Sequence, residues 1–205
     1  MRIGVFGGTF DPPHAGHVAV AEDARSELDL DRVLLIPAHV SPFKMGERGI
    51  TDPEVRLRMT EAAVRGSAGL EVDRIELDRD PPSYTVDTLR ALKERMPDAE
   101  LVLLLGADQW ASFARWKDAR EIARLADIAV MAREGEDPDD IDPGFAPGDE
   151  VTWHPVDVRR VDVSSTEIRE RVREGRSIAD LVPPPVARLI EEHELYRAAS
   201  AANTA

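Results

Sequence analysis

The stretch G-G-T-F-D-P-P-H-A-G-H, residues 7–17, follows a short apolar run over residues 2–6 and precedes apolar residues at helical spacing. Glycines permit tight turns and a close approach of backbone to phosphate, and a helix N-terminus presents unpaired N–H groups with partial positive charge. The stretch therefore predicts a phosphate-binding loop between a buried strand and a helix. It contains neither the G-x-G-x-x-G dinucleotide fingerprint nor the G-K-[ST] end of a P-loop.

Apolar runs and helical patterns alternate along the chain beyond this loop. The runs cover residues 31–37, 101–105 and 127–132, and helical periods start after Asp52-Pro53 and after residues 81–84. Their near-continuous apolar character is typical of parallel strands buried on both faces. We therefore expect an α/β fold with one Rossmann-like open parallel sheet and helices on both faces.

Ligands of such sheets bind beyond the C-terminal ends of the strands, at a switch point in strand order. The loops that follow the predicted strands should therefore form one functional edge. These are the loops after Phe6, Ile36, Leu105 and Met131.

Length and composition favour one compact domain. With 205 residues, 42% of them hydrophobic, the chain can bury a sizeable core. We expect a single domain over residues 1–197 and a flexible tail over residues 198–205, which are small and polar. Neither a membrane-length apolar run nor a signal-peptide pattern is found, so we expect a cytoplasmic protein without a membrane partner.

Charge and cysteine content exclude several classes of function. The formal net charge of -14 argues against a general nucleic-acid-binding surface, because affinity for a phosphate backbone comes largely from clustered Lys and Arg. The absence of cysteine excludes disulfides, thiolate nucleophiles and cysteine-ligated metal centres. Residues 134–150 contain eight acids and no Lys or Arg, which predicts a solvated loop rather than a metal site.

The two histidines of the opening stretch are the first candidates for chemistry. His14 and His17 are three residues apart, so they project to nearly the same side if a helix begins by Ala15. Both could then donate to one triphosphate. The same spacing also fits a pair of histidines that caps a turn, or part of a zinc site.

Two motifs near opposite ends of the chain resemble the signatures of the H-x-G-H nucleotidyltransferase superfamily. Residues 7–17 are similar to the first signature, and V-S-S-T-E-I-R at residues 163–169 is similar to the second, usually written I-S-S-T-x-I-R. Ser164 and Glu167 also fit a capping box that starts a helix. The resemblance implies that Arg169 contacts the β and γ phosphates of a nucleotide, whereas a solvent-exposed helix arginine is the alternative.

Segments in the middle of the chain resemble one family within that superfamily, the bacterial nicotinate mononucleotide adenylyltransferases. They are P-S-Y-T-V-D-T-L at residues 82–89, G-A-D at 106–108, F-x-x-W-K at 113–117, and 126–133, and the similarity continues to H-E-L-Y at 193–196. The resemblance implies a nucleotidyltransferase-type fold with ATP and nicotinate mononucleotide as partners. It further implies adenylyl transfer that yields nicotinate adenine dinucleotide (deamido-NAD) and pyrophosphate in NAD biosynthesis.

The resemblance also assigns roles to particular residues. It places Tyr84, Thr85 and Trp116 at the pyridine nucleotide, where an indole face suits an electron-poor ring and backbone N–H groups suit a carboxylate. Trp116 alone would be interpreted as a packing aromatic. Asp108 follows an apolar strand and could accept from a ribose hydroxyl, and helix capping is its alternative role.

The phosphate and nucleotide contacts expected for ATP complete the candidate site. The candidate catalytic residues are His14, His17 and Arg169, and the candidate ATP and phosphate-binding residues are Gly7, Gly8, Thr9, Phe10, Gly16, Lys44, Gly106, Asp108, Arg133, Ser164, Ser165 and Thr166. Two departures from the family pattern are Phe43, where the family often has histidine, and Glu134, where proline often follows the arginine. Mg²⁺ should accompany ATP, held mostly by phosphate oxygens and water, with no protein metal ligand assigned.

We expect the phosphate of nicotinate mononucleotide to attack the α-phosphorus of ATP in line, without a covalent enzyme intermediate. Three alternatives stay open: a pantetheine-phosphate adenylyltransferase, a nucleotide sensor without turnover, and a zinc hydrolase. Pantetheine-phosphate transfer is disfavoured by the middle segments and the longer chain. The zinc site is disfavoured because His39, His154 and His193 show no recognised ligand spacing with His14 and His17. The sequence leaves open the oligomeric state, including a homo-oligomer, and the closure of a loop over residues 37–50.

Overall fold

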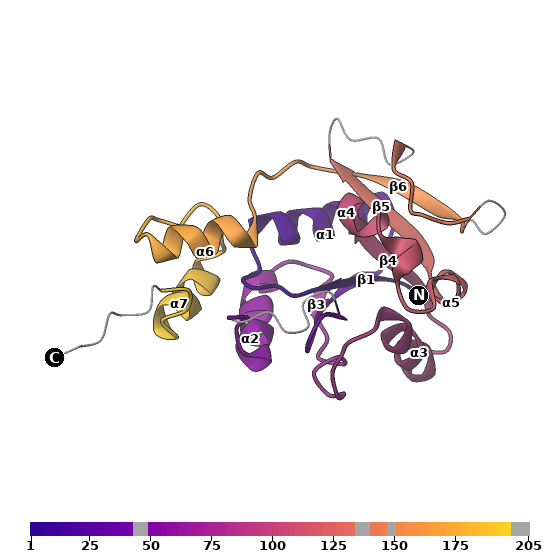
Figure 1. The fold of residues 1–205 in the computed structure, drawn as a ribbon, viewed down its shortest axis with the longest axis horizontal. Coiled ribbons are helices and arrows are strands. Elements are labelled where there is room, and N and C mark those ends of the chain that lie inside the picture. The colour runs from indigo at the N-terminus through magenta and orange to yellow at the C-terminus, as the bar shows by residue number, and fades with distance from the viewer. Residues whose placement is uncertain (43–48, 134–139, 147–150, 198–205) are drawn as a thin grey trace.

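The computed structural model describes residues 1–42, 49–133, 140–146 and 151–197, without the side chains of residues 132 and 133. Strands and helices alternate along most of this chain (Figure 1). In chain order they are β1 (Arg2–Gly8), α1 (Ala15–Glu27), β2 (Arg32–Pro37), α2 (Pro53–Val64), β3 (Leu70–Val72), α3 (Thr85–Arg95), β4 (Glu100–Gly106), α4 (Ala107–Trp110), the short 3-10 helix η2 (Phe113–Arg115), α5 (Ala119–Leu125), β5 (Asp127–Arg133), β6 (Trp153–Val158), α6 (Ser165–Arg173) and α7 (Pro184–Glu192).

The strands form one six-stranded sheet in the order β3-β2-β1-β4-β5-β6, and every pairing is parallel. The strand order reverses direction between β1 and β4, because β2 and β3 are added on one side of β1 and β4, β5 and β6 on the other. Such a switch point leaves a crevice at the C-terminal ends of the strands. The loops after β1 and β4 therefore diverge from neighbouring positions at one edge of the sheet.

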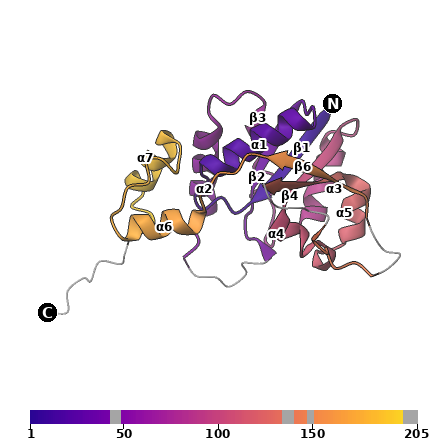
Figure 2. The ribbon, with the colours of Figure 1, turned by 90° about the horizontal axis from the view of Figure 1, so that it is seen from above.

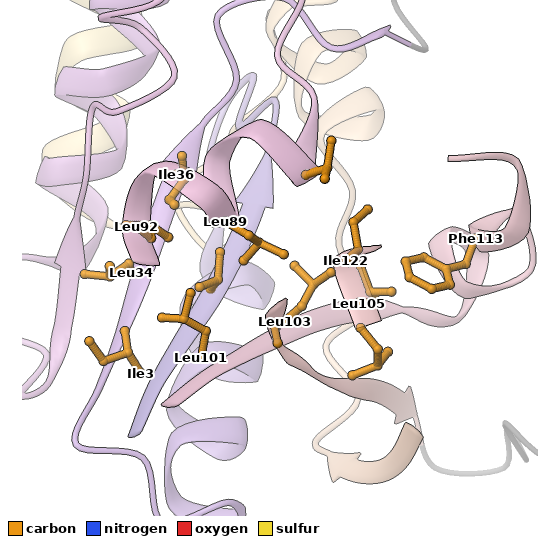
Figure 3. Close-up of a cluster of buried hydrophobic side chains, with 14 of the residues drawn as sticks. Ile3, Leu34, Ile36, Leu89, Leu92, Leu101, Leu103, Leu105, Phe113 and Ile122 are labelled. Atoms are coloured by element: carbon orange, nitrogen blue, oxygen red, sulfur yellow. The ribbon is translucent and has the colours of Figure 1, made fainter. Parts of the chain in front are cut away.

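Alternate residues of the central strands pack against helices on opposite faces of the sheet. Leu101, Leu103 and Leu105 face a core formed with α3 and α5, while Val102 and Leu104 face one that includes α1. Figure 3 shows the first of these cores, and Figure 1 shows α1 and α3 on opposite sides of the strands. Burial on both faces explains the continuous apolar runs in the sequence.

A third apolar cluster joins helices that lie far apart in the sequence. Met59 of α2, Ile168 of α6 and Val186 of α7 are each fully buried in it. Figures 1 and 2 place α6 and α7 together at one end of the molecule, next to α2. This packing brings the second signature motif, at the start of α6, back toward the first.

The predicted fold class is confirmed: the sheet is single, open and parallel, with helices on both faces. The helix start at Asp52 is also confirmed, because its side chain accepts hydrogen bonds from the amides of Glu54 and Val55. The two edge strands, β3 and β6, were not predicted. No helix in the described part of the chain is long and apolar enough to cross a membrane.

Candidate active site

The loop after β1 forms the centre of a cavity at the C-terminal edge of the sheet. This cavity of about 530 Å³ is bounded by the ends of four strands, by the start of α1 and by the start of α6. Its volume lies within the range of roughly 300–1,000 Å³ that is usual for small-molecule sites. The predicted residues that line it are Gly7, Gly8, Phe10, His14, Gly16, His17, Gly106, Asp108, Ser164 and Ser165.

His14 and His17 stack on one another at the entrance of α1. Their ring centroids are 3.7 Å apart. The Nδ1 of His14 accepts a hydrogen bond from the amide of His17 at 3.4 Å, and the Nδ1 of His17 accepts from the amide of His14 at 3.2 Å. The histidines therefore do cap the helix, as the alternative interpretation had it. Because both Nδ1 atoms are acceptors, the proton of each neutral ring lies on Nε2, which makes Nε2 a donor.

The environment of His17 favours its neutral form in the free protein. Burial lowers the pKa of His17 well below its usual value, and the neighbouring His14 lowers it further. Phe10 contributes to this burial, since its ring meets that of His17 edge-on at 5.0 Å. The backbone of Phe10 is left-handed, with φ of 49°, an arrangement that costs about 1 kcal/mol or more in a residue other than glycine. Packing of its ring on Phe6 and His17 holds it there.

The second signature motif docks directly on the first. The hydroxyl of Ser165 donates to the carbonyl of Pro12 at 2.9 Å, and Nη1 of Arg169 donates to the carbonyl of Asp11 at 2.7 Å. Gly16 permits this approach, because a Cβ there would lie 3.1 Å from both the ring of His14 and the side chain of Val163. The two distant motifs thus form one structure.

Not every predicted residue of the second motif lines the cavity. Ser164 and Ser165 do, at the start of α6. Arg169 lies one turn further along, and its Nη2 donates to the hydroxyl of Thr166 at 3.1 Å. Ser164 accepts from the amide of Glu167, but the carboxylate of Glu167 binds Arg171 at 2.6 Å, so only one half of the predicted capping box is formed.

A second cavity, of about 450 Å³, lies on the α3 side of the same loop. It is lined by three residues predicted for the pyridine nucleotide, Tyr84, Thr85 and Trp116, and by Thr9, which was predicted for ATP. Tyr84 is the N-cap of α3 and its side chain does not cap the helix. The start of α3 therefore lines the cavity without a side-chain cap on its first-turn amides.

The walls of this second cavity combine aromatic and cationic groups. The Nζ of Lys117 lies 4.3 Å from the centre of the Tyr84 ring and 3.0 Å from the carboxylate of Asp87. The indole N–H of Trp116 donates to the hydroxyl of Ser112 at 3.4 Å, and its ring also packs on the core beneath. Trp116 is thus both a packing aromatic and a cavity wall.

The two cavities share a wall made by the ends of β1 and β4. Gly7, Gly8, Asp108 and Gln109 line both of them. The capping alternative for Asp108 is wrong, because the N-cap of α4 is Gly106 and Asp108 lies in the first turn. Gln109 was not predicted; its side chain accepts from the amide of Gly106 at 3.1 Å and fixes the end of β4.

Three further residues were missed by sequence reasoning. Arg56 is 1% exposed and donates to carbonyls in three loops around the site. Glu76 is buried in the wall of the second cavity, where burial raises its pKa and hydrogen bonds from Thr88 and Ser83 oppose the rise. Tyr196 belongs to the terminal H-E-L-Y match, but nothing in that match linked it to the site.

Two predicted contacts cannot be placed. Lys44 and the variant position Phe43 lie outside the described residues, as do residues 134–139, 147–150 and the tail 198–205. Arg133 ends β5 at the same edge of the sheet, paired with Val158, and its side chain is not described.

Comparisons with known proteins identify the family. The family model described as cytidylyltransferase-like matches residues 5–171. A protein from Gemmatimonas aurantiaca is 44% identical over 200 residues, which cover 96% of this chain and 93% of the relative. One from Thermus thermophilus is 41% identical over 201 residues, covering 96% of this chain and all of the relative. Both are named probable nicotinate-nucleotide adenylyltransferase.

Solved structures share the fold. Plasmodium falciparum nicotinic acid mononucleotide adenylyltransferase complexed with NaAD has a TM-score of 0.75 at 17% identity, with 95% of this chain and 97% of that chain covered. The same enzyme complexed with APC gives the same TM-score and identity, with 96% of that chain covered.

Proposed function

The chain belongs to the nicotinate-nucleotide adenylyltransferase family, within the cytidylyltransferase-like group, and on this premise we propose that it transfers the adenylyl group of ATP to nicotinate mononucleotide. The products are nicotinate adenine dinucleotide and pyrophosphate, and the reaction is a step of NAD biosynthesis. Relatives that carry this name match nearly the whole chain, which favours this reaction over pantetheine-phosphate transfer.

One observation carries the proposal: two cavities meet at the glycine loop after β1. The first contains the histidine pair and the start of α6, and the second contains the aromatic residues and the start of α3. A triphosphate in the first and a pyridine nucleotide in the second would bring an α-phosphorus and a 5′-phosphate together over Gly7 and Gly8. This juxtaposition is what a direct transfer between two nucleotides requires.

The residues of the first cavity would act on the triphosphate. His14 and His17 present Nε2 donors, and the serines at the start of α6 offer N–H groups and the positive end of a helix dipole. Arg169 would turn from the Asp11 carbonyl toward the β and γ phosphates. Stabilising charge on the leaving pyrophosphate is then the main catalytic contribution, because the attacking phosphate is already anionic and needs little base catalysis.

The residues of the second cavity would select and orient the acceptor. The Trp116 face offers stacking to the pyridine ring, and the first-turn amides after Tyr84 suit its carboxylate. Lys117, beside Tyr84, adds positive charge at the same wall. A neutral carboxamide would gain less from these groups, which supports a preference for nicotinate over nicotinamide.

Mg²⁺ fits this site as a companion of ATP. Within the described ranges, no three His, Asp or Glu side chains are gathered as a ligand set. The carboxylate of Asp11 already accepts bonds from Thr51 and Tyr196. Phosphate oxygens and water would then hold most of the Mg²⁺ coordination, with Asp108 on the wall that both cavities share, and the ion would neutralise phosphate charge.

A product assay tests the proposal. The purified protein is incubated with ATP, Mg²⁺ and one of three acceptors: nicotinate mononucleotide, nicotinamide mononucleotide or phosphopantetheine. We expect dinucleotide and pyrophosphate in equal amounts, fastest with nicotinate mononucleotide. ATP binding without product would instead indicate a nucleotide sensor, and product only with phosphopantetheine would refute the proposed acceptor.

Two histidine variants assign the activity to this cavity. His17→Ala should lower kcat by about 10²–10³-fold, the effect of losing one donor to developing charge in a dry site, while the fold stays intact. His154→Ala removes an exposed imidazole on β6 and should keep wild-type kcat. Equal activity of the two variants would contradict the assignment.

A further inference from the structure

The signature loop between β1 and α1 is held by side chains from distant parts of the chain. Two consecutive prolines at 12 and 13 deprive it of backbone N–H donors. The carbonyl oxygens of Thr9, Asp11 and Pro12 accept hydrogen bonds at 2.7, 2.7 and 2.9 Å, one from a side chain of α2 and two from side chains of α6. The position of this loop therefore depends on outside partners.

The carboxylate of Asp11 is a further, buried anchor point of the loop. Asp11 is 5% exposed. One carboxylate oxygen accepts from the amide of Thr51 at 3.1 Å, and the other accepts from the hydroxyl of Tyr196 at 2.5 Å. Burial and the Asp11 charge raise the pKa of Tyr196 above its usual value, so its hydroxyl stays a donor.

Tyr196 reaches this position from near the C-terminus. It follows α7 in a turn where its own backbone is left-handed, with φ of 61°. Its ring packs against the apolar cluster that joins α2, α6 and α7. The hydroxyl is thus presented to a residue 185 positions earlier in the chain.

We propose that Tyr196 is a positioning residue for the phosphate site: its hydroxyl holds the Asp11 carboxylate and thereby sets the loop that carries His14 and His17. The phenol touches neither substrate in the proposed complex. It acts through Asp11, whose carbonyl also accepts a hydrogen bond from Arg169. Asp11 thereby links the first signature both to the second signature and to Tyr196. The inference rests on the proposed adenylyl transfer.

The position of the anchor predicts a selective kinetic effect. Beyond Thr9, the loop that contains Asp11 lines only the cavity with the histidines, while the acceptor cavity meets this loop no further than Thr9 and is also lined by the start of α3 and the segment before α5. Loss of the hydroxyl should therefore impair the ATP side and the transfer step, with little effect on the acceptor. A general loss of structure would affect both substrates alike.

The test is the full-length variant Tyr196→Phe, which removes only the hydroxyl. Because a hydrogen bond to a charged group is involved, we expect kcat to fall about 10-fold or more. The KM for ATP should rise, and the KM for nicotinate mononucleotide should stay within about twofold of the wild type. Arg197→Ala is the matched control, since it breaks the adjacent exposed pair with Glu194 and should leave all three values unchanged.

A double-mutant cycle with Asp11→Asn completes the test. If the hydroxyl acts through Asp11, the double variant should be no slower than Asp11→Asn alone. Additive losses would overturn the proposal, as would wild-type kinetics of Tyr196→Phe or equal effects on both KM values. Should Tyr196→Phe fail to fold, Asp11→Asn must show the same selective loss or the proposal fails. An inactive wild-type protein would instead refute the proposed function, which separates the two failures.

Discussion

Replacement of the buried arginine of α2 should destabilise the protein more than almost any other single polar substitution. Arg56 is 1% exposed, and its guanidinium donates to the carbonyls of Thr51, Thr9 and His39 at 2.9, 2.7 and 3.0 Å. Arg56→Met keeps the apolar stem but leaves three carbonyls without this donor. The desolvation of a buried charge is relieved at the same time, which offsets part of the loss.

The net cost of Arg56→Met follows from these opposing effects. Three hydrogen bonds from a charged donor contribute about 1.5–3 kcal/mol each, and relief of the buried charge reduces the sum to about 3–5 kcal/mol. In a chain of this size each kcal/mol lowers Tm by about 2–4 °C, so Tm should fall by about 6–20 °C. Such a loss is a large part of a total stability of about 5–15 kcal/mol.

Thermal and urea unfolding, followed by circular dichroism, measure this change. Arg58→Met is the matched control, because Arg58 is exposed on the same helix and its loss should alter stability by about 0.5 kcal/mol or less. An Arg56→Met protein whose stability is within about 1 kcal/mol of the wild type would refute the reasoning. It would mean that the three loops find other donors without cost.

Three further outcomes are expected. Trp116→Ala should raise the KM for nicotinate mononucleotide about tenfold, since stacking and burial are lost, and leave the KM for ATP within about twofold in steady-state assays. Glu76→Gln should raise Tm relative to the wild type more at pH 8 than at pH 4. The pKa of Glu76 is raised in the fold, so the wild-type protein loses stability as pH rises through that pKa and the buried side chain becomes charged, whereas glutamine stays neutral. ATP binding at pH 6 should take up protons, measured by calorimetry in two buffers, because phosphate charge raises a His17 pKa that burial lowers in the free protein.

Each of these outcomes has a result that contradicts it. Trp153→Phe, on the edge strand β6, is the control for Trp116→Ala, and equal acceptor KM values in the two variants would remove Trp116 from the acceptor site. A Tm difference for Glu76→Gln that does not change with pH would show that Glu76 titrates normally. Proton uptake that persists in His17→Ala would assign the proton to another group.

The central strands were predictable because a single property, burial on both faces of the sheet, determines their residues. β1, β2, β4 and β5 are covered on both faces, so burial alone gives their continuous apolar runs. The edge strands are less buried, so their sequences carry a weaker apolar pattern. β6 exposes three of its six residues and includes Pro155, and β3 has only three residues, so neither has the apolar pattern of a buried strand.

The residues of the site likewise fall into those that local sequence identifies and those that it does not. Residues 7–17 could be identified because their glycines and histidines suit a phosphate loop at a helix start, and residues 163–169 because they resemble the second signature and contain a helix-start pattern. Arg56 and Tyr196 could not, because their roles depend on tertiary packing: Arg56 is one of many arginines, and Tyr196 meets Asp11 only through the packing of α2, α6 and α7. The predicted separation of ATP and acceptor residues also left out the wall that they share, where Gln109 lies.

The central claim is that the adenylyl group passes directly from ATP to the acceptor nucleotide, with the two bound in adjoining cavities. The most direct measurement is the stereochemical course of the reaction at the α-phosphorus. It is followed with a single diastereomer of ATP in which sulfur replaces one non-bridging oxygen of the α-phosphate. A single in-line displacement inverts the configuration in the dinucleotide product, and inversion is the result that we predict. Retention would require two displacements through an adenylyl-enzyme, and would contradict the direct transfer.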